Sequence, residues 1–170
     1  MDRYLVVANQ TATSPALDRA IGERIARGPC FFHVVVPCTG ASDLARYFAL
    51  VSETVPGYIG SFTEAVFEGP SPQERASARL ADQLTRLTEL GATSTGEVGD
   101  EDPMLAIGSA LADASAAAEP YVYTEIVLST LPASISRWIN MDLPNRVRRR
   151  FSLSVVVVET KESELGSTLP

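Results

Sequence analysis

The chain has few cysteine and histidine side chains, and they lie close together in sequence. Two cysteines, Cys30 and Cys38, flank an apolar run that contains the only histidine, His33. If this run is a strand, eight steps of about 3.3 Å separate the two Cα atoms by roughly 26 Å, whereas a disulfide tolerates about 7 Å. A nucleophilic cysteine would need a base beside it, and a metal site would need further ligands. We therefore expect free thiols, a histidine with structural partners, no catalytic residue and no metal site.

A group of arginines near the C-terminus is the second candidate, as a surface for nucleic acid. Its members are Arg146, Arg148, Arg149 and Arg150. On a helix these positions spread around much of the circumference of the last turns, where cations complement the helix dipole. The formal net charge of −7 repels phosphate backbones and anionic lipid. The pattern therefore favours a solvated helix end, and we expect neither nucleic acid nor a membrane as a partner.

Apolar runs alternate with helical patterns along the chain, which is typical of a parallel sheet covered by helices on both faces. Five strands are expected, at residues 3–8, 31–37, 93–98, 125–129 and 153–159. Four helices are expected, at 14–27, 71–91, 102–118 and 143–150, and Ser-Pro or Asp-Pro pairs begin three of them. Ser71 and Glu74 have the spacing of a capping box. Residues 38–70 form an irregular connection that carries a helix-like segment at 43–51 and several aromatic side chains.

Right-handed crossovers, which are nearly obligatory, make this order of elements an open doubly wound α/β fold. Its five parallel strands would have the order 3-2-1-4-5, with the valine-rich last strand at an edge. In such a sheet a ligand crevice lies at the carboxyl ends of strands 1 and 4, where the strand order reverses. The residues expected at this crevice are Asn9, Gln10, Thr11, Val36, Pro37, Ser129 and Thr130.

The layout is similar to that of the universal stress proteins over roughly residues 3–159. Residues 4–9 resemble the opening strand of that family, and residues 96–107 resemble its third strand and the Gly-x-Pro segment before the next helix. Residues 125–158 resemble its closing strand, loop, helix and strand. The resemblance implies a nucleotide-shaped pocket. It also implies an antiparallel two-fold dimer in which the last strand of each subunit covers the edge of its copy.

The loop that holds phosphate in nucleotide-binding members of this family is changed here. Those members carry Gly-x-x-Gly, nine residues, then Gly-Ser or Gly-Thr, because glycines let backbone amides close on phosphates. Ser129, Pro132 and Asp142 stand at the glycine positions, and Asp142 also suits the N-cap of the last helix. Asn9 stands where binding members usually have an aspartate beside the adenine. We therefore expect ATP to bind weakly or not at all.

Hydroxyls and a guanidinium in the same loop offer a different anion site. Its residues would be Ser129, Thr130, Ser134, Ser136 and Arg137, although hydroxyls before a helix also serve as local caps and turns. Trp138, the only tryptophan, is either a packing anchor or a stacking surface.

Three functions stay open from the sequence. The first is a non-enzymatic domain, acting as a cytoplasmic homodimer, that binds a small ligand; the resemblance implies an adenine nucleotide. The second is a nucleotide-using enzyme of the same fold superclass, although the chain lacks the His-rich and Ser-Gly-Gly motifs of such enzymes. The third is a dimeric scaffold without ligand. The first apolar run is too short for a secretory segment or a membrane span. The domain is expected at residues 1–159, with a disordered tail at 160–170.

Overall fold

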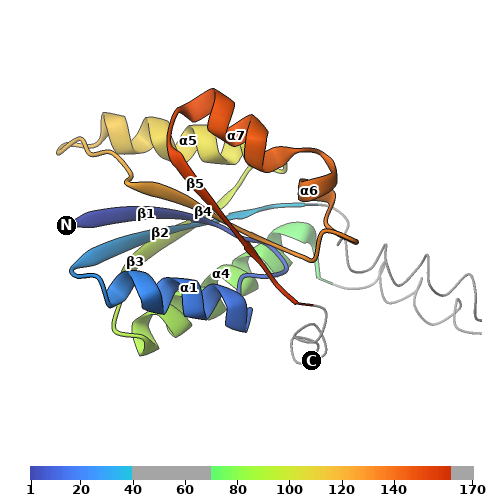
Figure 1. The fold of residues 1–170 in the computed structure, drawn as a ribbon, viewed down its shortest axis with the longest axis horizontal. Coiled ribbons are helices and arrows are strands. Elements are labelled where there is room, and N and C mark those ends of the chain that lie inside the picture. Colours follow the sequence, from blue (N-terminus) through green and yellow to red (C-terminus); the bar gives the residue numbers. More distant parts are fainter. Residues whose placement is uncertain (40–69, 162–170) are drawn as a thin grey trace, which may run out of the picture.

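A computed structural model describes residues 1–39 and 70–161 as a five-stranded parallel sheet with helices on both faces (Figure 1). The strands are β1 (Asp2–Val7), β2 (Cys30–Pro37), β3 (Thr93–Gly99), β4 (Glu125–Thr130) and β5 (Ser154–Glu159). The helices in these ranges are α1 (Pro15–Ile25), α4 (Pro72–Glu89), α5 (Pro103–Ala116), α6 (Arg137–Asn140) and α7 (Leu143–Phe151). The strand order is β3-β2-β1-β4-β5, with all pairs parallel, which confirms the fold predicted from the sequence.

Two predicted segments fall largely outside the described residues. The predicted connection is described only at residues 38, 39 and 70, so its helix-like segment lies outside them, and the predicted disordered tail is described only at 160 and 161. Thr160 continues the fold one residue beyond β5, because its buried backbone N–H donates to the carbonyl of Thr130 (2.9 Å). None of the helices in the described ranges has the length and apolar character needed to cross a membrane.

Alternate residues of the central strands enter two separate hydrophobic cores, as the period of a strand requires. Leu5 and Val7 of β1 pack in the core beneath α5 and α7, whereas Tyr4 and Val6 pack in the core against α1 and α4. Figure 1 shows these two helix layers on opposite sides of the sheet. The apolar runs are buried on both faces, which is why they show no polar alternation.

Local signals in the sequence begin the longer helices where predicted. The hydroxyl of Ser14 accepts from the backbone N–H of Leu17 (3.2 Å), and Asp102 accepts from that of Met104 (2.8 Å). Ser71 and Glu74 form the reciprocal capping box (3.2 and 2.7 Å). Each cap satisfies backbone donors that a helix start leaves without partners.

A close approach between α4 and the sheet depends on Gly96 of β3. A Cβ built at this residue would lie 2.6 Å from the side chain of Leu80 and 2.6 Å from the carbonyl oxygen of Val34. Because real Cβ atoms do not come so near, any larger residue would push α4 away or bend β3. The glycine therefore sets the position of α4, which carries Arg79 toward the carboxyl end of β1.

The other end of the sheet is held by a buried ion pair. Arg24 of α1 is 4% exposed, and its Nε donates to the carboxylate of Glu125, the first residue of β4 (2.8 Å). A second nitrogen of the same guanidinium also pairs with this carboxylate. A third donates to the carbonyl of Ala20 (2.6 Å), so the buried charge has partners on several sides.

Candidate functional site

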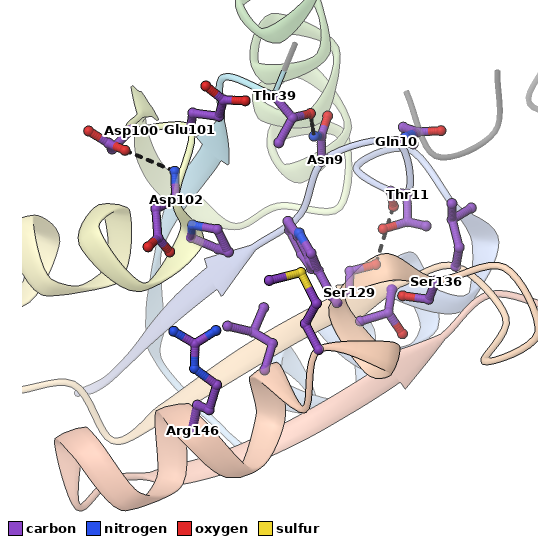
Figure 2. Close-up of a pocket in the computed structure, with 16 residues that line it drawn as sticks. Asn9, Gln10, Thr11, Thr39, Asp100, Glu101, Asp102, Ser129, Ser136 and Arg146 are labelled. Atoms are coloured by element: carbon purple, nitrogen blue, oxygen red, sulfur yellow. Dashed lines mark hydrogen bonds between the residues drawn. The ribbon is translucent and has the colours of Figure 1, made fainter. Parts of the chain in front are cut away.

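A pocket of about 410 Å³ opens at the carboxyl ends of β1 and β4, where the strand order reverses (Figure 2). This volume is within the range of about 300–1,000 Å³ that is usual for small-molecule sites. The described residues that line it are Asn9, Gln10, Thr11, Thr39, Asp100, Glu101, Asp102, Pro103, Ser129, Thr130, Leu131, Ser136, Trp138, Met141, Leu143 and Arg146. They come from the carboxyl ends of β1, β2, β3 and β4, from the segments before α5, α6 and α7, and from these helices themselves.

The structure brings six of the ten predicted site residues to this pocket: Asn9, Gln10, Thr11, Ser129, Thr130 and Ser136. Val36 and Pro37 do not line it; both are buried, and Val36 packs in the core against α1 and α4. Ser134 is exposed in the turn before α6 and is not a lining residue. Arg137 begins α6, and its side chain lies outside what the structure describes.

The amide of Asn9 is held in one orientation by two neighbours. Its Oδ1 accepts from Nη1 of Arg79 (2.7 Å), and its Nδ2 donates to the hydroxyl of Thr39. Asn9 itself is buried. Burial and the nearby charge of Arg75 lower the pKa of Arg79, because both disfavour its charged form. Sequence reasoning missed Arg79, which lies 70 residues from Asn9 on another element.

Hydroxyls line the inner part of the pocket, and two of them have no hydrogen-bond partner among the described residues. Thr11 and Thr130 are 3% and 1% exposed, and the Oγ1 atom of each is buried without a partner in the ranges 1–39 and 70–161. Ser129 makes a long hydrogen bond to the carbonyl of Thr11 (3.4 Å), and Ser136 accepts from the backbone N–H of Ile139 (3.3 Å). Unpartnered buried hydroxyls are uncommon and costly, so they mark a place where a ligand could supply partners.

One wall of the pocket is apolar. Trp138 of α6 belongs to the core beneath α5 and α7 and also lines the pocket, so it packs in the core and presents a surface to the pocket. Its apolar neighbours in the lining are Pro103, Leu131, Met141 and Leu143. Sequence reasoning gave no signal for α6, because a helix of four residues has no repeating apolar pattern.

The outer rim carries charges that sequence reasoning did not assign to the site. Asp100, Glu101 and Asp102, together named here the acidic turn, are exposed between β3 and α5 and line the pocket. Asp100 accepts from the backbone N–H of Asp102 (2.8 Å), so the turn is ordered by its own carboxylate. In Figure 2, the half-buried guanidinium of Arg146 points toward the side of the pocket where Asp102 lies. The prediction of a solvated arginine group is therefore wrong for Arg146, although the other three arginines are exposed.

Asp142, at one of the family's glycine positions, does not cap α7 as expected. It occupies the N-cap position in the left-handed conformation (φ 55°), and its side chain makes no capping hydrogen bond. The carboxylate instead accepts from Nδ2 of Asn145 (2.6 Å) and pairs with Arg149 (3.2 Å). The left-handed backbone turns the side chain away from the amides that an extended N-cap residue would reach.

The two cysteines and the histidine are not among the described residues that line the pocket. His33 is on β2, with Nδ1 2.8 Å from the hydroxyl of Thr95 and Nε2 3.6 Å from the carboxylate of Glu97. Cys30 and Cys38 are free cysteines, and burial raises the pKa of the Cys30 thiol. Within the ranges 1–39 and 70–161, no three His, Cys, Asp or Glu side chains form a group that could hold a metal ion.

Comparisons with known proteins agree on the fold. A universal stress protein from Archaeoglobus fulgidus has a similar structure, with a TM-score of 0.51 and 13% identity over 93% of each chain. A universal stress protein family protein from Arabidopsis thaliana, solved with AMP bound, has a TM-score of 0.52 and 8% identity. That match covers 96% of this chain and 95% of the other. No family model and no curated protein sequence matches the chain. The chain has the universal stress protein fold.

Proposed function

We propose that this protein is a non-enzymatic, cytoplasmic homodimer that binds a small ligand of the nucleoside class in the pocket at the carboxyl ends of β1 and β4. The observation that carries this proposal is the pair of buried hydroxyls, Thr11 and Thr130, which line the pocket and have no hydrogen-bond partners within the part of the chain that the structure describes. A buried polar group that lacks a partner costs free energy, and a ligand with hydroxyls or ring nitrogens would remove that cost.

The two walls of the pocket suit the two halves of a nucleoside. A planar base can lie against Trp138 and its apolar neighbours, where aromatic stacking adds to burial. The sugar hydroxyls can face the hydroxyl and amide groups of the opposite wall. The Arabidopsis protein of this fold was solved with AMP bound, which supports an adenine compound as the first ligand to test.

The sequence also supports a site that binds its ligand without catalysing a reaction and that binds ATP weakly. The only histidine, His33, and both cysteines are absent from the described lining of the pocket. Ser129, Pro132 and Asp142 replace the glycines that let backbone amides approach phosphates. Pro132 has no N–H to donate.

A matched pair of threonine variants tests the proposal. Thr130 and Thr160 both carry buried hydroxyls without partners, but only Thr130 lines the pocket. We expect calorimetry to show adenosine binding to the wild type. Thr130→Val should weaken it about three- to tenfold, through loss of one hydrogen bond. Thr160→Val should bind adenosine as the wild type does.

Two results would contradict the proposal in different ways. If adenosine does not bind, and native mass spectrometry of protein purified from cells finds no small molecule, the dimeric scaffold without ligand is the better account. If ATP binds with a dissociation constant near or below 1 μM, about −8 kcal/mol, the pocket has a phosphate grip that the glycine positions do not reveal.

A further inference from the structure

The pocket lies beside two helix starts, and an aspartate precedes each of them. The start of a helix normally attracts anions, because its first backbone N–H groups point outward and carry partial positive charge. At α5, the carboxylate of Asp102 already accepts from the N–H of Met104 (2.8 Å). At α7, Asp142 makes no capping hydrogen bond and pairs with Arg149 instead (3.2 Å). The start of α5 is therefore partly neutralised by the chain itself, whereas that of α7 is not.

The charged groups of the lining reinforce this effect. The acidic turn contributes three carboxylates to the described lining, and Arg146 is the one lysine or arginine among those residues, which leaves a formal net charge of −2. Only a few of the carboxylate oxygens of the turn are occupied by the backbone N–H groups of Asp102 and Met104. The rim therefore repels a ligand with several negative charges and offers one place for a single anionic group.

We propose that the acidic turn is a specificity determinant that selects nucleosides and nucleoside monophosphates and rejects di- and triphosphates, with Arg146 as the partner of a single phosphate. This inference rests on the proposed nucleoside site, whose buried unpartnered hydroxyls indicate a ligand independently of the charges on the rim. It adds a cause of weak ATP binding that is separate from the replaced glycines. The two causes respond differently to salt. Salt screens the charge repulsion from the acidic turn, whereas it does not change the shape of the loop that lacks the glycines.

The experiment is a calorimetric comparison of adenosine, AMP, ADP and ATP, at low salt and with EDTA so that no metal ion masks the phosphates. In the wild type we expect affinity to fall with each phosphate beyond the first, and ATP to bind at least about tenfold more weakly than AMP. The variant Asp100→Asn/Glu101→Gln should raise the ratio of ATP affinity to adenosine affinity about three- to tenfold. The amide introduced in place of the Asp100 carboxylate keeps an oxygen that can accept from the N–H of Asp102, so the turn should keep its shape.

A second double variant is the control, because it also removes two negative charges but does so outside the pocket. Asp113→Asn/Glu119→Gln changes two exposed carboxylates outside the described lining, on α5 and just beyond its end, and should leave the ratio of ATP to adenosine affinity unchanged. Arg146→Gln should weaken AMP but not adenosine.

The possible results distinguish a failure of this inference from a failure of the proposed function. Equal affinity for all four compounds, or equal effects of the two double variants, would overturn the inference and leave a nucleoside site in place. Failure of all four compounds to bind would remove the proposed function and the inference together.

Discussion

At the scale of single residues, Asn9 shows how one substitution changes the partners of a neighbour. The resemblance to universal stress proteins puts an aspartate at this position in binding members. Here Asn9 accepts from Arg79, whose guanidinium has no carboxylate partner among the described residues. A neutral amide therefore accepts from a half-buried cation, which is a weaker arrangement than an ion pair between a guanidinium and a carboxylate.

The variant Asn9→Asp should consequently stabilise the fold at neutral pH. The carboxylate of the aspartate would form an ion pair with the guanidinium of Arg79. This should raise the free energy of unfolding by about 1 kcal/mol, or the midpoint of thermal unfolding by roughly 2–4 °C. The cation should lower the pKa of the new carboxyl, so the gain is present above the ordinary pKa of about 3.9 and is lost as pH falls through the lowered value. The double variant Asn9→Asp/Arg79→Gln is the control, and a gain that persists in it would show that Arg79 is not the cause.

The sequence predicted the residues of the pocket that follow β1 and β4, because strand order alone brings those strand ends together. It missed Arg79 and the acidic turn, which reach the site from the middle of one helix and the start of another. Arg146 was missed because four arginines in five positions look alike in sequence, and only the folded structure separates the half-buried one from the exposed ones. Val36 was assigned wrongly to the lining, because strand alternation turns it into the core.

At the scale of elements, helix starts were predictable where a local signal exists. The Ser-Pro and Asp-Pro pairs before α1, α4 and α5 form their caps within three residues, so no tertiary information is needed. The start of α7 was predicted at the right residue, Leu143, but its cap was not, because Asp142 adopts a left-handed conformation and makes no capping hydrogen bond. Local chemistry therefore gives the caps of three helices, whereas the fourth begins where expected without the expected cap.

The capping box of α4 should make part of the stability depend on pH. Hydrogen bonds from Ser71 lower the pKa of Glu74 below its ordinary value of 4.5, so the capped form loses stability as pH falls through that lowered value. Urea unfolding between pH 7 and pH 3 should show a smaller loss on acidification for Glu74→Gln than for the wild type. Ser71→Ala should cost about 1 kcal/mol at pH 7. Ser77→Ala, at an exposed site within α4, should cost nothing, because alanine has the higher helix propensity, and an equal cost there would show that loss of the cap is not what is measured.

At the scale of the whole molecule, the two edges of the sheet differ. The β5 edge presents Val156, Val157 and Val158, which are all half-buried, whereas the β3 edge carries exposed Thr93 and Thr95. The guanidinium of Arg148 donates to the backbone carbonyl of Val155 (3.1 Å), so one carbonyl of β5 has an arginine partner. The stretch from Val156 to Val158 has no lysine or proline that would discourage pairing with another chain.

We therefore expect a dimer through β5, and Val157→Lys should dissociate it. The introduced charge would be buried without a partner at the interface, whereas Thr95→Lys on the β3 edge should leave the dimer intact. Sedimentation velocity at tens of micromolar measures the mass, and circular dichroism shows whether the variant is still folded. A wild type that sediments as an 18.2 kDa monomer would rule the dimer out.

The ion pair between Arg24 and Glu125 also bears on the order of folding. Its partners are 101 residues apart in sequence, and β1 pairs with β2 on one side and with β4 on the other. During synthesis, the unit of β1, α1 and β2 is complete long before Glu125 emerges, so the guanidinium of Arg24 has no carboxylate to meet. The last turn of α1 can form this ion pair only after β4 has been synthesised and paired with β1. Contacts between residues so far apart in sequence form late and slowly. We therefore expect the two halves of the sheet to become stable together, as one cooperative unit.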